Sequence, residues 1–125
     1  NAGEAVFDRL LIEEIGKPVT FVVRENPVIN DVTKQEAVEA GIDRVADIIS
    51  SGTEAPGNVM HTCTAAFKEI FENAQMIISK GQGNFEALSD VNAPIFFLLK
   101  AKCSVIADHI GVKEDSLILM KNRYV

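Results

Sequence analysis

The run of residues best suited to chemistry is Lys80-Gly81-Gln82-Gly83-Asn84, which follows an apolar stretch with the composition of a strand. The two glycines allow a sharp backbone turn, and Asn84 is a residue type that often opens a helix. A lysine and free backbone N–H groups, presented where a strand meets a helix, suit a phosphate group. The run therefore predicts a phosphate-binding loop.

Other polar clusters follow the remaining predicted strands: Arg24 with Pro27-Val28-Ile29-Asn30-Asp31, then the segment 52–57, then Lys100-Ala101-Lys102. Because ligands of open parallel sheets bind beyond the carboxyl ends of the strands, we expect these clusters to share one rim. Carboxylate and amide oxygens are hard ligands for Mg²⁺ or Mn²⁺, and lysines neutralise a phosphate bridged to such an ion. Phosphoryl transfer needs this mixture of groups.

Each candidate also has a simpler structural explanation. Asp31 is close enough to Thr33 to serve only as a turn or capping residue, and Asn84 can be a helix cap without excluding ligand contact. Gly81 and Gly83 can simply make the turn, and Lys80 and Lys100 can be solvated strand ends. His61 is interpreted as a surface histidine. His109, near a helix C-terminus, is interpreted as a residue that complements the helix dipole.

The elements that must position these residues follow from apolar periodicity. We expect a helix with an inward stripe of Val6, Phe7, Leu10, Leu11 and Ile15, and further helices over residues 33–40, 59–73 and 105–110. Strands are predicted at residues 19–23, 48–49, 76–79, 95–99 and 117–120. Short continuous apolar strands are typical of a parallel sheet covered on both faces. The pattern predicts a Rossmann-like three-layer α/β/α fold with a mainly parallel sheet, in one domain over residues 1–125.

Composition narrows the classes of partner. The 125 residues carry a net charge of −6 and are 47% hydrophobic, with a mean hydropathy of +0.14, which indicates a packed globular core. The negative charge makes a broad nucleic-acid or anionic-membrane surface unfavourable, and the apolar runs are too short to span a bilayer. Cys63 and Cys103 lie forty positions apart with no Cys/His cluster, which favours two buried free thiols in a reducing cytoplasm over a zinc site.

The first residues have an unusual setting. Asn1-Ala2-Gly3-Glu4 stands directly before a helical pattern, without a methionine, as in the middle of a strand–loop–helix unit. We therefore expect a fragment or a processed chain that lacks an N-terminal strand and helical region. Its own N-terminal segment, as a separate chain, is then a candidate partner.

These motifs together resemble the damage-control phosphatase family, also catalogued as domain of unknown function 89. The matching blocks are Asn1-Ala2-Gly3-Glu4, Asn30-Asp31, Ser50-x-Gly52-(x)₃-Pro56-Gly57, Lys80-Gly81-Gln82-Gly83-Asn84-Phe85 and Leu99-Lys100-Ala101-Lys102-Cys103. The match is nearest to the stand-alone archaeal and bacterial branch, related to the phosphatase domain attached to some pantothenate kinases. The resemblance covers essentially the whole chain.

The resemblance implies a phosphatase that uses a divalent metal, Mn²⁺ or Mg²⁺ with Co²⁺ or Ni²⁺ as alternatives, and acts on small phosphorylated, often damaged, metabolites. It implies that Asn1 and Asp31 hold the metal. Lys80, Gly81, Gln82, Gly83 and Asn84 match the family's substrate loop, and Lys100 is similar to a phosphate-contacting lysine. The aspartate that the family places before Asn1 is not in this sequence, so no catalytic residue is assigned.

Two functions of different classes are consistent with these residues. The first is a metal-dependent phosphomonoesterase, or the C-terminal catalytic portion of one. The alternative is a non-catalytic α/β module that binds a phosphorylated metabolite or completes a larger assembly.

Overall fold

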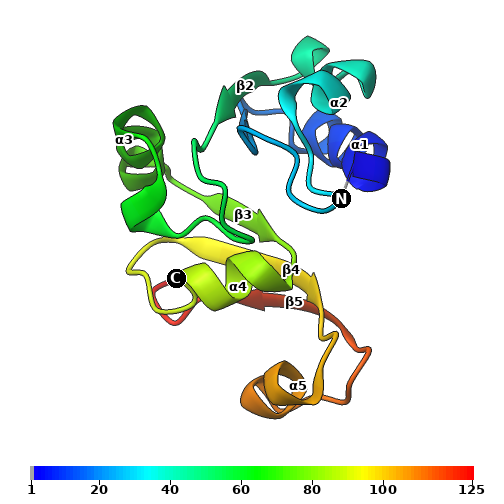
Figure 1. The fold of residues 1–125 in the computed structure, drawn as a ribbon, viewed down its shortest axis with the longest axis vertical. Coiled ribbons are helices and arrows are strands. Elements are labelled where there is room, and N and C mark those ends of the chain that lie inside the picture. Colours follow the sequence, from blue (N-terminus) through cyan, green and yellow to red (C-terminus); the bar gives the residue numbers. More distant parts are fainter. Residues whose placement is uncertain (1) are drawn as a thin grey trace. The chain divides into compact units, whose positions relative to one another are not determined.

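The structure is a computed structural model that describes residues 2–125. The chain divides into two compact units (Figure 1). The first unit comprises Asn1–Ala55 with Thr62–Phe67, and the second comprises Pro56–His61 with Lys68–Val125. The described strands form a two-stranded sheet, β1-β2, and a three-stranded sheet in the order β3-β4-β5.

The sheet of the first unit is parallel. Strand β1 (Thr20–Val23) pairs with β2 (Asp47–Ser50), with Thr20 opposite Asp47 and Val23 opposite Ser50. Parallel strands need a crossover connection, which here contains α2 (Lys34–Glu39) and the 3-10 helix η2 (Ile42–Arg44). The buried side chains of Ile12, Val23, Ala37 and Ile42 form the core of this unit.

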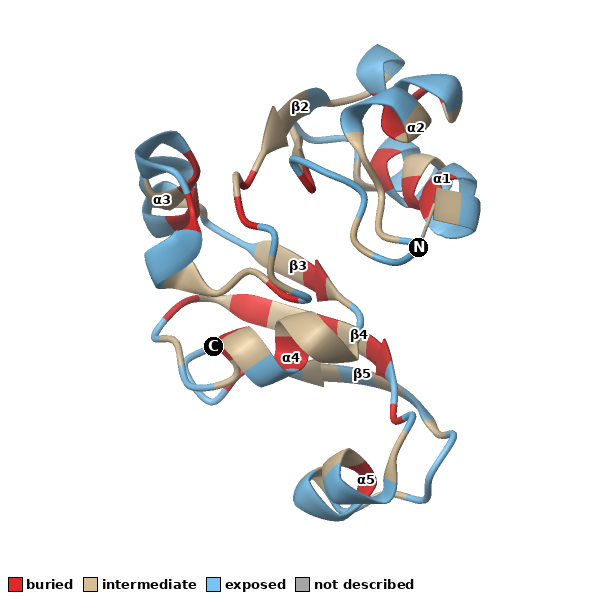
Figure 2. Ribbon diagram, viewed as in Figure 1, coloured by how far each residue is buried: buried red, intermediate tan, exposed pale blue. Residues whose placement is uncertain are grey.

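The first helix corrects one prediction. A 3-10 turn, η1 (Ala2–Glu4), leads into α1 (Ala5–Ile15), which ends at Gly16 in the left-handed conformation. Its buried residues are Ala5, Asp8 and Ile12, whereas Phe7 is 70% and Leu10 is 57% exposed. Figure 2 shows buried and exposed residues along α1. The expected inward stripe is therefore wrong at Val6, Phe7, Leu10 and Leu11, which are all exposed, whereas its last member, Ile15, is half-buried. The face that meets the core carries Ala5 and Ile12 instead.

The sheet of the second unit is mixed. Strand β3 (Ile77–Lys80) runs parallel to β4 (Ile95–Lys100), and β5 (Leu117–Lys121) runs antiparallel to β4. The alternate residues Ile95, Phe97 and Leu99 of β4 are buried. Helix α4 (Gln82–Leu88) covers this face, and the rings of Phe85 and Phe97 meet edge to face with centroids 5.2 Å apart.

The remaining helices lie in the connections between strands. The 3-10 helix η3 (Met60–Thr62) precedes α3 (Ala65–Asn73), and α5 (Ser104–Ile110) connects β4 to β5. The single helix predicted over 59–73 is wrong, because the Thr64 hydroxyl oxygen accepts the Phe67 N–H at 3.2 Å and starts α3 anew. The α/β class with mainly parallel pairing is confirmed. No helix among residues 2–125 has the length and apolar character needed to cross a membrane.

Candidate functional site

The turn between β3 and α4 holds the predicted phosphate-binding loop. Strand β3 ends at Lys80, and Gly81 follows with φ 91°, a conformation that side-chain-bearing residues rarely adopt. The Gly81 N–H donates to the carbonyl oxygen of Leu98 on β4 at 2.9 Å. Gln82 and Gly83 then open α4, where the first N–H groups of a helix lack an intrahelical acceptor. The strand–glycine–helix arrangement is confirmed.

Asn84 does not cap this helix, which corrects the predicted capping role. The cap residue is Gly81, and Asn84 is the third residue of α4. Its amide nitrogen donates to the Lys80 carbonyl oxygen at 2.9 Å. Its amide oxygen accepts the N–H of Asn58 at 2.9 Å. The side chain therefore ties the end of β3 and the segment 56–58 to the helix.

Two glycines let that segment lie directly on α4. A Cβ atom at Gly83 would overlap the carbonyl oxygen of Pro56, and one at Gly57 would overlap the carbonyl oxygen of Gly83. Gly57 also has φ 148°. This backbone-to-backbone approach requires glycine at both positions. The sequence predicted a turn at Gly83 and placed Gly57 in the segment that follows β2, but it gave no indication that the two glycines touch.

The second cationic group stands at the end of the neighbouring strand. Lys80 pairs in register with Leu98, so Lys100 lies on the same sheet face, two residues farther along β4. Strand spacing and rise put the two Cα atoms about 8 Å apart. The Lys100 ammonium contacts a carboxylate oxygen of Asp115 at 2.7 Å, and both side chains are exposed. Lys80 and Lys100 thus share one edge of the second unit's sheet, as expected for parallel strands.

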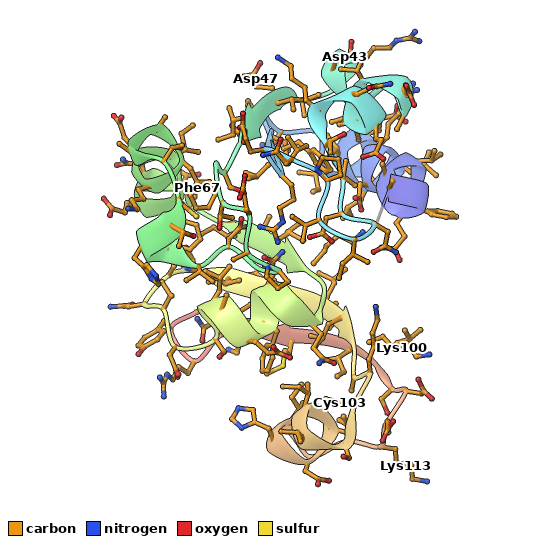
Figure 3. All side chains as sticks on the ribbon, in the orientation of Figure 1. Asp43, Asp47, Phe67, Lys100, Cys103 and Lys113 are labelled. Atoms are coloured by element: carbon orange, nitrogen blue, oxygen red, sulfur yellow. The ribbon has the colours of Figure 1, made fainter. Side chains whose placement is uncertain are left out.

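Gln82 connects this edge to the chain that follows β4. Its side-chain oxygen accepts the N–H of Lys102 at 2.9 Å, and its nitrogen donates to Glu86 at 2.8 Å. The same nitrogen lies 3.5 Å from the sulfur of Cys103. Cys103 stands at the start of α5 (Figure 3). Cys63 and Cys103 are free thiols, but only Cys63 is buried, so the prediction of two buried thiols is half correct.

Asp31 belongs to the first unit and has a cationic partner. The Arg24 Nε atom donates to Oδ2 of Asp31 at 3.0 Å, and the Arg24 side chain is only 8% exposed. The Asp31 N–H closes a tight turn onto the carbonyl oxygen of Val28 at 3.0 Å. Sequence reasoning placed Arg24 near the rim but did not pair it with Asp31, because the turn between them has no strong signature.

The other predicted metal ligand, Asn1, lies outside the described residues. Its neighbour Ala2 donates its N–H to the carbonyl oxygen of Asn30 at 2.8 Å, which joins the start of the described chain to the segment that carries Asp31. No group of three His, Cys, Asp or Glu side chains in residues 2–125 is close enough together to hold a metal. The donor chemistry at Asp31 still fits a hard cation, because carboxylate oxygens are hard ligands, and Arg24 orients this carboxylate through Oδ2.

Comparison with known proteins decides the family. The model of the damage-control phosphatase ARMT1-like domain matches residues 1–118. This chain belongs to the damage-control phosphatase family. The resemblance inferred from the motifs is confirmed over nearly the whole chain.

Three relatives of similar identity illustrate the match. This chain is 41% identical to a damage-control phosphatase of Pyrococcus horikoshii, and the match covers 99% of this chain and 45% of that protein. It is 40% identical to a damage-control phosphatase of Archaeoglobus fulgidus, over 94% of the chain and 43% of that protein. An uncharacterised protein of Methanocaldococcus jannaschii is 41% identical over 97% of the chain and 42% of its length.

A solved structure supports the fold. The crystal structure of a DUF89 family protein from Pyrococcus horikoshii superposes with a TM-score of 0.89 at 41% identity. The match covers 94% of this chain and 43% of that one. The chain therefore spans less than half the length of the curated relatives and the solved structure that it matches.

Proposed function

We propose that this chain carries metal-binding and substrate-binding residues of a phosphatase that uses a divalent metal to hydrolyse small phosphorylated, damaged metabolites. The observation that carries the proposal is the pair Lys80 and Lys100 on one face and at one edge of a sheet, beside a glycine turn, in a chain of the damage-control phosphatase family. The named relatives are damage-control phosphatases.

The lysines supply the phosphate contacts in this proposal. Lys80 projects from the last residue of β3, and Lys100 is held by Asp115 in an exposed ion pair. Exposed pairs of this kind contribute only about 0–1 kcal/mol, so a phosphate group with two negative charges can replace Asp115 at little cost.

The metal ligands in this proposal are Asp31 and Asn1, with Mn²⁺ or Mg²⁺ as the ion and Co²⁺ or Ni²⁺ as alternatives. Arg24 holds Oδ2 of Asp31 and thereby fixes the rotamer of the carboxylate. The ion, when bound, supplies positive charge that polarises a phosphoryl group. Lys80 and Lys100 bind and orient the phosphate oxygens.

Metal depletion and restoration test the proposed reaction. The purified protein is treated with a chelator, dialysed, and assayed with p-nitrophenyl phosphate while Mn²⁺, Mg²⁺, Co²⁺ or Ni²⁺ is added back. We expect hydrolysis only with a divalent ion. Binding of phosphate without turnover under every ion would instead support the alternative function, a non-catalytic module that binds a phosphorylated metabolite.

A further inference from the structure

We propose that Asn84 is a positioning residue: it fastens the segment 56–58 and the Lys80–Gly81 peptide to α4, and so sets the geometry of the phosphate loop. The inference rests on the proposed phosphate binding by this loop, and it gives Asn84 an indirect part in place of a direct contact with substrate.

The two hydrogen bonds of the Asn84 amide to segment 56–58 and to Lys80 match its chemistry. The Lys80 carbonyl oxygen can only accept a hydrogen bond and the Asn58 N–H can only donate one, and Asn84 meets both at 2.9 Å. A primary amide offers a donor and an acceptor on one short side chain. The orientation of the amide is therefore dictated by its partners, and the side chain is partly buried between them.

The peptide group between Lys80 and Gly81 is held at both ends. Its carbonyl oxygen accepts from Asn84, and its N–H, which belongs to Gly81, donates to Leu98 at 2.9 Å. Both polar ends of this peptide group are thus held, one by the helix and one by the neighbouring strand. The backbone from which the Lys80 side chain projects is fixed by these two bonds.

The backbone itself brings segment 56–58 against α4, independently of any side chain. Gly57 and Gly83 lie so close that a Cβ atom on either would overlap the backbone of the other segment. The contact between segment 56–58 and the first turn of α4 is therefore a direct contact between backbones. The hydrogen bond from the Asn58 N–H to Asn84 lies beside this contact and holds the segment there. An account in which Asn84 serves only the substrate leaves this close approach unexplained.

The test combines amide hydrogen exchange with titration of inorganic phosphate into the purified protein by calorimetry. Asn84→Ala removes both contacts, so we expect faster exchange at Asn58 and Gly81 and a phosphate affinity that is roughly tenfold lower. Asn84→Asp keeps an acceptor for Asn58 but loses the donor to Lys80, so exchange at Asn58 should stay slow while exchange at Gly81 rises. Asn73→Ala is the matched control, because Asn73 is exposed and donates only within its own helix to Glu69.

Gly83→Ala provides a second variant that leaves Asn84 in place. Its new methyl group must displace Pro56, so exchange at Asn58 should rise and phosphate affinity should fall as in Asn84→Ala. Weaker phosphate binding by Asn84→Ala with unchanged exchange at Asn58 and Gly81 would show a direct substrate contact and overturn the proposal. Faster exchange with unchanged phosphate affinity would overturn it too. Failure of the wild-type protein to bind phosphate would instead remove the proposed function on which the inference rests.

Discussion

Arg24 is the residue whose importance the sequence alone does not reveal. A guanidinium group that is only 8% exposed needs a partner for its charge, and Asp31, seven residues later, supplies a carboxylate oxygen at 3.0 Å. The turn that brings them together includes Ile29 with φ 55°, a conformation that no sequence pattern in this region predicts. The sequence marked Asp31 as a candidate ligand, but it did not predict that Arg24 orients the Asp31 carboxylate.

Asp31→Asn tests the metal assignment at this scale. The substitution keeps the shape of the side chain and removes its charge, so the affinity of the protein for Mn²⁺ should fall at least about tenfold, which corresponds to roughly 1.4 kcal/mol. Calorimetric titration of Mn²⁺ measures this change. Asp43→Asn, at an exposed residue of η2 in the same unit (Figure 3), should leave the affinity unchanged. Equal losses in both variants would show a non-specific charge effect.

Ser79 gives a prediction about stability. Its hydroxyl is buried on β3, and the described residues provide it no hydrogen-bond partner. Ser79→Ala removes this buried polar group, so the free energy of unfolding should rise by about 1 kcal/mol. Ser51→Ala is the comparison, because the buried Ser51 hydroxyl donates to the carbonyl oxygen of Val23, and its loss should destabilise. Urea denaturation measures both, and destabilisation by Ser79→Ala would show that the hydroxyl has a partner.

At the scale of elements, periodicity predicted the order and type of the main helices and strands but not which face of α1 is buried. That helix carries apolar residues on more than one face, and composition does not say that the core receives Ala5 and Ile12 while Phe7 stays exposed. Helix starts were missed where a local contact decides them. Gly81 caps α4 through its unusual backbone conformation. Helix α3 begins after Thr64, whose hydroxyl oxygen accepts the Phe67 N–H.

Helix α2 provides a pH-dependent prediction. A Glu36 carboxylate oxygen accepts from the backbone N–H of Thr33 at 2.8 Å and from its hydroxyl at 2.9 Å. These bonds, the backbone one foremost, lower the pKa of Glu36 below its ordinary value. The stabilisation is therefore present at pH values above the ordinary glutamate pKa and is lost as the pH falls through the lowered one.

Glu36→Gln is the variant that isolates this effect. The amide oxygen still accepts a hydrogen bond but does not titrate, so the difference in melting temperature between wild type and variant should shrink as the pH drops below the usual carboxylate range. Glu39→Gln, in the last turn of the same helix, serves as the control. A difference that stays constant between neutral and acidic pH would contradict the capping role of the Glu36 charge.

At the scale of the whole molecule, the sequence predicted the class of fold and part of the candidate site. Lys80 and Lys100 were placed at one sheet edge by the parallel pairing alone, since the carboxyl ends of parallel strands must coincide. The contacts that shape that edge were not predictable, because the Gly57–Gly83 approach and the Asn58–Asn84 bond each join residues 26 positions apart in sequence. Asn1 lies outside the described residues, so its assignment as a metal ligand stays a prediction.

Hydrolysis of p-nitrophenyl phosphate in the presence of Mn²⁺, compared between wild type and Lys80→Met, tests the central claim most directly. A charged hydrogen bond to phosphate is worth about 1.5–3 kcal/mol, so kcat/KM should fall roughly 10- to 100-fold. Lys113→Met, at an exposed lysine in the loop before β5, is the matched control and should retain wild-type activity. Unchanged kcat/KM in Lys80→Met, with wild-type protein active, would show that the phosphate does not sit on this loop and would contradict the account.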